Sequence, residues 1–541
     1  MTIEAWIADD PDPGDRAELR GLLDRADTAE LRDRFAGRLR FGTAGLRGIV
    51  AAGPNRMNRA VVRGATAAVA GWLGNSGSVV VGCDARHRSA EFADEVARVL
   101  AGAGITVHML PVPCPTPLLA FSVRQLRTEA GVMITASHNP ARDNGYKLYL
   151  GDGAQVIPPA DGEIEARIAA LGPLSQIPVA GTDSPLIIRH GDELAAAYLQ
   201  AIVIKTGGGA PPLNVVYTPM HGVAGGLMLR AIAAAGYPAP FVVTAQAEPD
   251  PDFPTVAFPN PEEPGALDLA LADARRLDAD LVIANDPDGD RLAVAVPSPD
   301  GWRALTGDQV GALLGAAQLR WTASVAGRRR LAATTIVSST LLSAIAAEAG
   351  VEFAQTLTGF KWIVRAADGK PGTRFVFGYE EALGYAVGDV VRDKDGMSAA
   401  LAMLRLAAEA KAAGRSLLDL YDDLETAHGV HMTSQVTLRT NEPSTIMSRL
   451  RAESPRSFDG EAVQTVIDLA EGGGGLPPSD VLIFRLHQAR VVLRPSGTEP
   501  KIKCYIEIVE PLAGRSLTGA RAAAADRTAS LRAALGAVLS G

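Results

Sequence analysis

Two short runs of residues in this chain could together perform phosphoryl chemistry. Ser137 lies in the run from Thr135 to Pro140, and three carboxylates alternate along the run from Asp286 to Asp290. A serine hydroxyl is a weak nucleophile that needs a base or a metal beside it, and His138 and Lys147 are nearby in the sequence. Three hard carboxylate oxygens suit Mg²⁺. The runs therefore indicate a nucleophile and a magnesium site.

Each run also has a simpler interpretation. Ser137 follows an apolar strand and is expected to be exposed, yet Asn139-Pro140 alone is also typical of an ordinary turn. The acidic run could be a solvated turn or a calcium loop, although it lacks the Glu expected at position 12 of an EF-hand. The buried strand before it and Arg291 after it favour a metal site. Without a cation, the three carboxylates should repel one another and their pKa values should rise.

Two further runs could recognise a phosphorylated sugar. The run from Arg494 to Lys501 contains one Arg, two hydroxyls and a Gly, which suits a phosphate cradle, although a Pro/Gly hairpin loop is the alternative. Glu380 and Glu381, in the run from Gly378 to Tyr385, can each accept sugar hydroxyl hydrogens. Alternatively, they belong to a charged loop that enters a helix with Asp395 as its cap.

A glycine-rich run near the N-terminus adds a possible anion contact. Three glycines surround Arg47 between Phe41 and Gly48, which suggests close backbone approach to an anion. The chain contains neither a Walker loop nor G-x-G-x-x-G, so nucleotide-binding classes lose their main support.

Short β-branched segments alternate with amphipathic segments over most of the chain, which predicts α/β layers with parallel or mixed sheets. The last hundred or so residues instead cluster strands before a long Ala/Arg-rich helix, which predicts a smaller α+β domain. We expect strands at 78–82, 105–110, 131–135, 213–217, 241–244, 280–284, 331–337, 433–438, 481–486, 489–493 and 502–508, and helices at 90–103, 225–235 and 340–349.

The length of 541 residues exceeds one hydrophobic core and indicates several domains. A Gly/Pro cluster at 207–212 is a candidate linker, and 472–478 a loop. We expect four domains, at residues 1–206, 207–320, 321–430 and 431–541.

Composition limits the partners and the compartment. The formal net charge is −9, and an acidic chain without long basic runs is a poor candidate for general nucleic-acid binding. Three widely spaced cysteines argue against a disulfide framework or a zinc site and fit a reduced cytoplasm. No signal peptide and no apolar run long enough for a membrane span is expected.

Taken together and in this order, the five runs resemble the α-D-phosphohexomutase superfamily, which includes phosphoglucomutases, phosphomannomutases and phosphopentomutases. The resemblance covers almost the whole chain. It implies four domains around a central cleft, three α/β and one smaller α+β, with one active-site loop from each. It also implies an isomerase that moves phosphate between the 1- and 6-positions of glucose or mannose, through a phosphoserine and a sugar 1,6-bisphosphate that serves as intermediate or activator.

The resemblance also implies individual roles. Ser137 would be the phosphoserine, and its phosphate would bind Mg²⁺ together with Asp286, Asp288 and Asp290. The remaining implied residues line the cleft or bind the sugar and its second phosphate: Arg47, His138, Lys147, Arg291, Thr358, Gly359, Glu380, Glu381, Lys394, Arg494, Ser496, Gly497 and Thr498. The general base stays open among His138, Lys147 and Lys394. The partner would be a small phosphosugar, and monomer or dimer is left open.

One departure from the family pattern bears on the substrate. Many members carry Ser two residues after Glu380, where this chain has Ala382. The run Glu-Glu-Ala at 380–382, followed by Asp-Lys-Asp-Gly at 393–396, looks more like the phosphopentomutase and sugar-bisphosphate-synthase branch. A phosphopentomutase or glucose-1,6-bisphosphate synthase is therefore the alternative. A metal-dependent sugar phosphatase, or a non-catalytic phosphosugar-binding regulator, fits less well.

Overall fold

The computed structural model describes residues 2–42, 45–206, 212–324, 327–496 and 501–540. The chain divides into two compact units. The first contains residues 1–304 and 384–408, and the second contains residues 305–383 and 409–541. The candidate linker at 207–212 lies almost wholly outside the described residues.

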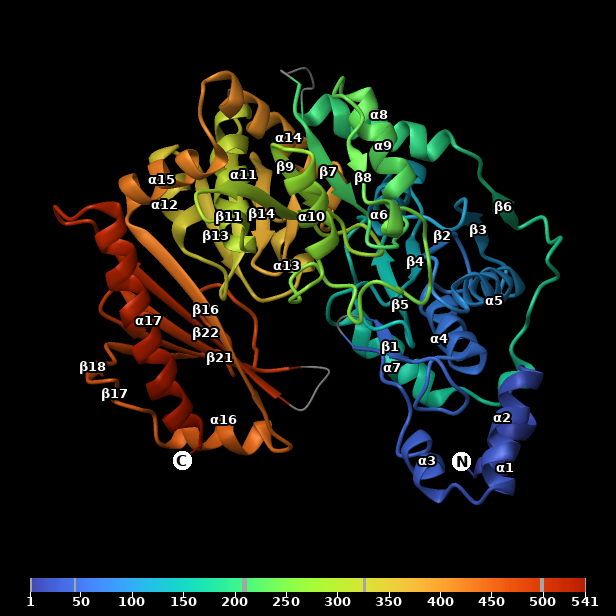
Figure 1. The fold of residues 1–541 in the computed structure, drawn as a ribbon. Coiled ribbons are helices and arrows are strands. Elements are labelled where there is room, and N and C mark those ends of the chain that lie inside the picture. Colours follow the sequence, from blue (N-terminus) through green and yellow to red (C-terminus); the bar gives the residue numbers. More distant parts are fainter. Residues whose placement is uncertain (1, 43–44, 207–211, 325–326, 497–500, 541) are drawn as a thin grey trace. The chain divides into compact units, whose positions relative to one another are not determined.

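A six-stranded mixed sheet forms the first half of the first unit (Figure 1). Its order is β1-β5-β4-β2-β3-β6, in which β4, β2, β3 and β6 run parallel while β1 and β5 pair antiparallel. The strands are β1 (Leu46–Ile49), β2 (Ser78–Cys83), β3 (Thr106–Met109), β4 (Ala130–Ile134), β5 (Asp143–Leu150) and β6 (Ile187–Arg189).

Helices cover this sheet because their apolar faces pack on its Val/Ile-rich strands. Val62 of α4 and Val96 of α5 belong to one core cluster with Val79 and Val132 of the sheet. The helices of this half are α1 (Ile3–Asp9), α2 (Pro13–Asp24), α3 (Thr28–Arg34), α4 (Arg59–Trp72), α5 (Ser89–Gly102), α6 (Thr116–Leu126), α7 (Ala160–Ala170), η1 (Leu174–Gln176) and α8 (Glu193–Thr206).

A five-stranded mixed sheet, in the order β11-β10-β9-β7-β8, completes the first unit. Its central strand β9 is buried throughout and pairs parallel with β7, and the acidic run from Asp286 to Asp290 follows it directly. The elements are β7 (Val215–Thr218), α9 (Gly225–Ala234), β8 (Phe241–Val242), η2 (Thr244–Gln246), α10 (Asp268–Arg276), β9 (Leu281–Ala284), β10 (Ala293–Ser298) and β11 (Gly301–Ala304). Strand β15 (Gly384–Ala386), later in the chain, belongs to the first unit but not to this sheet.

The second unit begins with a parallel arrangement in which β12 lies between β13 and β14. The elements are α11 (Gly307–Trp321), β12 (Arg329–Thr335), α12 (Leu341–Glu348), β13 (Glu352–Thr356), α13 (Phe360–Ile363) and β14 (Thr373–Glu380). Helix α14 (Gly396–Ala412) begins in the first unit and ends in the second, and α15 (Leu417–His428) follows.

An antiparallel sheet in the order β16-β22-β21-β20-β19 forms the C-terminal part, with α16 and α17 on one face (Figure 1). Ala524 and Leu535 of α17 pack on Val491 and Ile506 of the strands. The elements are β16 (Val430–Arg439), α16 (Pro443–Ala452), β17 (Ser457–Phe458), β18 (Glu461–Ala462), β19 (Thr465–Asp468), β20 (Leu482–Leu486), β21 (Ala489–Pro495), β22 (Lys501–Glu510) and α17 (Leu517–Ser540). The predicted α/β layers and smaller α+β domain are thus confirmed.

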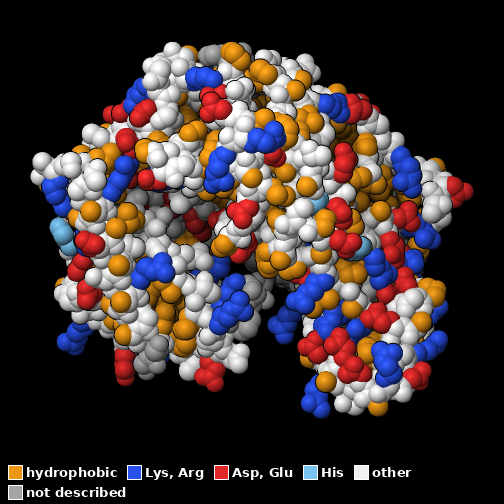
Figure 2. Space-filling model, viewed as in Figure 1, with side chains coloured by type: hydrophobic (Ala, Val, Ile, Leu, Met, Phe, Trp, Pro, Cys, Tyr) orange, Lys and Arg blue, Asp and Glu red, His pale blue; other side chains and the backbone are white. Residues whose placement is uncertain are grey.

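Charged side chains of both signs lie intermixed on the face drawn in Figure 2, notably over α1–α3 at the lower right. Residues of these helices also form ion pairs, including Arg34 with Glu18 at 2.5 Å and Asp15 with Arg88 at 2.7 Å. No helix among the described residues has both the length and the apolar character that a membrane crossing requires.

Candidate active site

Ser137 lies at the end of β4 and is fully buried. The expectation of an exposed serine was therefore wrong, because loops from other segments of the first unit cover this strand end. Its Oγ lies 3.1 Å from Oδ2 of Asp286 and 3.1 Å from Nδ1 of His138. The predicted meeting of two residues 149 positions apart is thus present in the structure. The serine hydroxyl faces both a carboxylate and an imidazole.

The three aspartates form one buried cluster on the loop after β9. One carboxylate oxygen from each of Asp286, Asp288 and Asp290 lies within 4.8 Å of the others, and all three residues are fully buried. Gly289 has a φ of +74°, which lets the loop turn tightly between the second and third aspartates. Alternate positions in this loop therefore do bring three carboxylates together, as the sequence predicted.

The cluster fits a divalent cation. Among the residues that the structure describes, none donates a hydrogen bond to Oδ1 of Asp288 or to Oδ1 of Asp290. Buried carboxylate oxygens without a donor are costly unless a cation or proton satisfies them. A set made only of hard carboxylate oxygens suits Mg²⁺ better than a soft metal. The donor set is therefore consistent with the expected magnesium site.

Two lysines supply positive charge beside these carboxylates. Lys147 on β5 donates to Oδ2 of Asp288 at 2.7 Å and to Oδ2 of Asp290 at 3.0 Å. Lys394 lies 3.3 Å from Oδ2 of Asp290, so its segment contributes to the site of the first unit. Thr116, at the start of α6, donates to Asp288 at 2.6 Å and is a contact that sequence reasoning missed.

The electrostatics of the aspartates differ from the simple expectation. Burial and the neighbouring carboxylates raise the pKa of Asp286 well above its usual range, as predicted. Burial also acts to raise the pKa of Asp288, but the adjacent Lys147 ammonium outweighs it and lowers that pKa. The expectation that all three pKa values rise was therefore wrong for Asp288, because a buried cation lies against it.

The remaining predicted residues of the first unit surround Ser137. Nη2 of Arg291 lies 3.5 Å from Nε2 of His138, and Nη1 of Arg47 lies 3.4 Å from Oδ1 of Asn139. Burial and the nearby Arg291 lower the pKa of His138 well below its usual range.

A Cβ on Gly45 would lie 1.9 Å from the carbonyl oxygen of Tyr146. The close approach at this glycine is therefore to the chain's own backbone.

The segment around Lys394 is anchored by buried hydroxyls. Tyr149 donates to Asp393 at 2.8 Å, and Tyr198 donates to Asp395 at 2.8 Å. Asp395 also accepts the backbone N–H of Met397 at 3.0 Å, at the start of α14. The helix cap that the sequence offered as an alternative interpretation is thus present, and it coexists with the contact of Lys394 to Asp290.

The second unit brings together the predicted sugar and phosphate residues. Nη1 of Arg494 donates to Oγ1 of Thr358 at 2.9 Å, and its guanidinium lies 5.8 Å from the ring centre of Tyr505. Arg494 lies on β21 and not in the loop, because that strand continues to Pro495. Ser496 donates its backbone N–H to the carbonyl of Lys501 at 2.9 Å. Gly497 and Thr498 lie outside the described residues.

Glu380 and Glu381 stand at the end of β14. The carboxylate of Glu381 accepts hydrogen bonds from Ser338 at 2.9 Å and Thr335 at 3.3 Å. Burial, with the nearby Asp308, raises the pKa of Glu381. Hydroxyls thus fix the orientation of the Glu381 side chain.

Gly359 has a φ of +111°, a conformation that favours glycine, and directly precedes α13.

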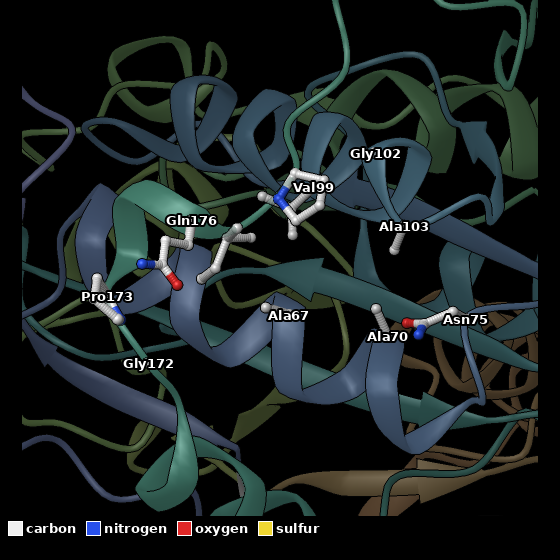
Figure 3. Close-up of a pocket in the computed structure, with 11 residues that line it drawn as sticks. Ala67, Ala70, Asn75, Val99, Gly102, Ala103, Gly172, Pro173 and Gln176 are labelled. Carbon is white, nitrogen blue, oxygen red and sulfur yellow. The ribbon is translucent and has the colours of Figure 1, made fainter.

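A separate cavity lies away from these residues. Its volume is about 470 Å³. Figure 3 shows its lining residues on α4, α5 and the segment 172–178. Its lining contains only apolar side chains, glycines, Asn75 and Gln176, and none of the predicted site residues. It therefore offers neither acid, base nor cation for phosphoryl chemistry.

The combination of three α/β layers, an antiparallel C-terminal sheet and a buried serine facing an aspartate cluster defines the phosphosugar mutase class. The phosphoglucomutase/phosphomannomutase family is described by four domain models, and this chain matches all of them. The three alpha/beta/alpha domains match at residues 38–173, 196–301 and 306–427, and the C-terminal domain at 449–515. The chain therefore belongs to this family, as the resemblance indicated.

Individual relatives agree with this assignment. The chain is 41% identical over 467 residues to a probable phosphomannomutase of Haemophilus influenzae, covering 83% of this chain and 93% of that protein. It is 34% identical over 558 residues to a phosphopentomutase of Mus musculus, covering 94% and 89%. The crystal structure of a putative phosphomannomutase from Thermus thermophilus matches with a TM-score of 0.68 at 25% identity, covering 91% and 99%.

Proposed function

We propose that this mutase interconverts the 1-phosphate and 6-phosphate of glucose or mannose, with Ser137 as the residue that carries phosphate. The observation that carries the proposal is the 3.1 Å approach of the Ser137 hydroxyl to Asp286 within the buried acidic cluster. The names of similar proteins support the substrate class, since they include a phosphomannomutase and phosphoglucomutases.

The proposed reaction has two transfers. In the first, the P–O bond to Ser137 breaks and a P–O bond to the free hydroxyl of the sugar monophosphate forms. The hydroxyl proton passes to one of three groups, His138, Lys147 or Lys394, and a sugar 1,6-bisphosphate results. In the second, the phosphate that the sugar carried at the start is transferred to Ser137. The P–O bond to its sugar oxygen breaks, and that oxygen takes up the proton. Positioning and electrostatics supply most of the catalysis in such transfers.

Asp286, Asp288 and Asp290 are the residues that would hold Mg²⁺, together with the phosphate on Ser137. When bound, the ion would offset negative charge on the transferring phosphoryl group. Lys147 and Lys394 add fixed positive charge at the same place, since both contact these carboxylates. The family membership supports this metal, as does the lack of donors to two carboxylate oxygens among the described residues.

Residues of the second unit are proposed to bind the rest of the substrate. Glu380 and Glu381 accept sugar hydroxyl hydrogens, and Thr358 with Gly359 contacts the sugar. Arg494, Ser496, Gly497 and Thr498 bind the phosphate that is not reacting. Arg494 supports this role because its planar guanidinium can make paired charge-assisted hydrogen bonds, and Thr358 already orients it at 2.9 Å. In the first unit, Arg47 and Arg291 face the phosphate on Ser137.

A second candidate function is supported by Ala382 and by 34% identity to phosphopentomutases. In that case the substrate is a pentose phosphate, or the product is glucose 1,6-bisphosphate. We keep the three limits between the four domains, near residues 206, 320 and 430, as a proposal; the middle one falls inside α11. We also propose a cytoplasmic location, because Cys83, Cys114 and Cys504 are buried free thiols.

The decisive experiment compares wild type with Ser137→Ala on glucose 1-phosphate, and the control is Ser122→Ala. Ser122 is also a buried serine of the first unit, but its hydroxyl only donates to the carbonyl of Leu118. We expect isomerised product without equivalent free phosphate, a phosphorylated wild-type mass, and no turnover in Ser137→Ala. Unphosphorylated wild type with an active Ser137→Ala variant would refute the proposal, and equimolar free phosphate would indicate a phosphatase.

A further inference from the structure

We propose that Arg86, paired with Asp84, is a positioning residue that holds Ser137 in a strained backbone conformation from which its hydroxyl faces Asp286. The inference rests on the proposed function of Ser137. Both residues belong to the loop between β2 and α5, and both are buried. They contact the serine loop without being part of it.

The backbone of Ser137 has a φ of +53°. This left-handed region is unfavourable for a serine, and residues held there at functional sites persist only when their surroundings impose the conformation. The conformation determines where the side chain points, because the Cα–Cβ bond turns with the backbone. The contacts of Ser137 Oγ to Asp286 and His138 therefore depend on whatever fixes this peptide unit.

Arg86 fixes the carbonyl side of Ser137. Its Nη2 donates to the carbonyl oxygens of Ser137 and Asn139, both at 2.6 Å. Its Nη1 donates to the carbonyls of Pro140 at 2.8 Å and Asp143 at 3.2 Å. One guanidinium thus binds four backbone oxygens between residues 137 and 143. A planar group with several donors can span such a set, whereas a single ammonium cannot.

Asp84 fixes the amide side of the same residue. Its Oδ2 accepts from Oγ1 of Thr135 at 2.6 Å, and this Oγ1 accepts the backbone N–H of Ser137 at 2.9 Å. The same carboxylate lies 3.3 Å from Nε of Arg86 and also accepts from Ser89 at 2.6 Å. The N–H and the C=O of Ser137 are therefore both fixed by one buried ion pair.

This arrangement affects the chemical step more than substrate binding. Nothing in the described contacts of Arg86 reaches the residues of the second unit that are proposed to bind sugar and distal phosphate. A misplacement of about 1 Å at a reacting group can reduce the rate about a hundredfold. Loss of Arg86 should therefore lower kcat by roughly ten- to a hundredfold and change KM little.

The test uses Arg86→Ala and Arg86→Lys, with Arg330→Ala as the matched control. Arg330 also donates to three backbone carbonyls, of Leu319, Thr322 and Ala349, but it belongs to the second unit and none of these carbonyls is part of the serine loop. We expect low kcat with a nearly unchanged KM in both Arg86 variants. Millimolar guanidinium should partly restore kcat in Arg86→Ala, whereas sodium at equal ionic strength should not. Arg330→Ala should retain wild-type kcat.

Thr135→Val provides a second test if Arg86→Ala does not fold. It removes the hydroxyl between Asp84 and the Ser137 amide while keeping the side-chain shape, and we expect the same fall in kcat. Wild-type kcat in a folded Arg86→Ala or Thr135→Val variant would overturn the inference, as would a loss that guanidinium does not reverse. Wild-type protein that turns over without phosphate on Ser137 would instead refute the proposed function.

Discussion

Oγ of Ser137 and Oδ2 of Asp286 lie 3.1 Å apart although β4 and β9, the strands that carry them, belong to different sheets. Each residue follows the carboxyl end of a buried strand. Ligand sites in open α/β sheets form at these ends. The two strand ends therefore bring together the hydroxyl that we propose accepts phosphate and the carboxylates that suit a cation.

The first prediction concerns the metal. Chelation should stop turnover and added Mg²⁺ should restore it, because the buried carboxylates need a cation to face an incoming phosphoryl group. Asp288→Asn removes one ligand and should weaken Mg²⁺ binding on the order of tenfold or more. Titration calorimetry on the purified variant measures this directly. Asp300→Asn, at an exposed position, is the control. Full activity after exhaustive chelation would contradict the assignment.

The second prediction concerns the distal phosphate. Arg494→Ala should lower kcat/KM for sugar phosphates, since each hydrogen bond to a charged group contributes roughly 1.5–3 kcal/mol. This corresponds to a loss of about 10- to 150-fold per bond. Arg439→Ala, on β16 of the same sheet, is a suitable control because Arg439 is exposed. An unchanged kcat/KM in Arg494→Ala would mean that this strand end is only a hairpin.

The third prediction concerns the stability of the second unit in acid. Burial alone would raise the pKa of Glu507, but Arg490, at 2.7 Å, and His431 outweigh it and lower the pKa to about 2 from 4.5. The unfolded chain therefore binds the proton more readily than the folded one. The stabilisation is complete above about pH 4.5 and is lost as pH falls from there towards 2. It amounts to about 3 kcal/mol for this shift.

Thermal unfolding between pH 3 and 7 checks this prediction. Wild type should lose stability steeply below pH 4.5, and Glu507→Gln should show a shallower loss over the same range. Glu453→Gln, at an exposed position, should behave as wild type. Parallel curves for wild type and Glu507→Gln would show that another carboxylate governs acid unfolding.

The sequence predicted many of the strands, the helices α5, α9, α12 and α17, and the charged cluster, because those depend on local patterns. The run from Asp286 to Asp290 follows an apolar strand, and both features are visible within ten residues. Arg86 and Thr116 were missed because their partners lie 51 or more residues away, at Ser137 and Asp288. Asp84-Ala85-Arg86 does follow the end of β2, a parallel neighbour of β4, and this placement was the available signal.

The burial of Ser137 could not be predicted from its own run. A serine before Asn-Pro is typical of an exposed loop, and only covering segments from elsewhere in the first unit make it inaccessible. The helices α1–α3 were also missed, although Pro13 at the first turn of α2, after the capping Asp12, is a recognisable helix start. Lys394 falls within the third predicted domain and within the match to the family's third alpha/beta/alpha domain, while its segment groups with the first compact unit.

The last prediction is that substrate choice extends to pentose phosphates. Ala382 is half-buried and follows Glu381 just after the end of β14. A serine hydroxyl at this position could hydrogen-bond a sugar hydroxyl, and a site built in that way penalises analogues that lack the partner. Alanine makes no such bond, so a smaller sugar that lacks this hydroxyl loses less binding free energy at this position. In the proposed site, Glu380 would still accept a sugar hydroxyl and Arg494 would still bind the second phosphate.

A shorter sugar also displaces the reacting hydroxyl, and this displacement lowers the rate on pentose phosphates. The ratio of kcat/KM for ribose 1-phosphate to that for glucose 1-phosphate shows whether this displacement or the weaker discrimination at Ala382 dominates. We expect wild type to turn over ribose 1-phosphate beside glucose 1-phosphate, and Ala382→Ser to shift the ratio of kcat/KM values towards glucose. Ala413→Ser, at an exposed position, should leave the ratio unchanged. If wild type shows no pentose turnover and Ala382→Ser leaves the ratio unaltered, this loop does not set specificity, and the chain acts on hexose phosphates alone.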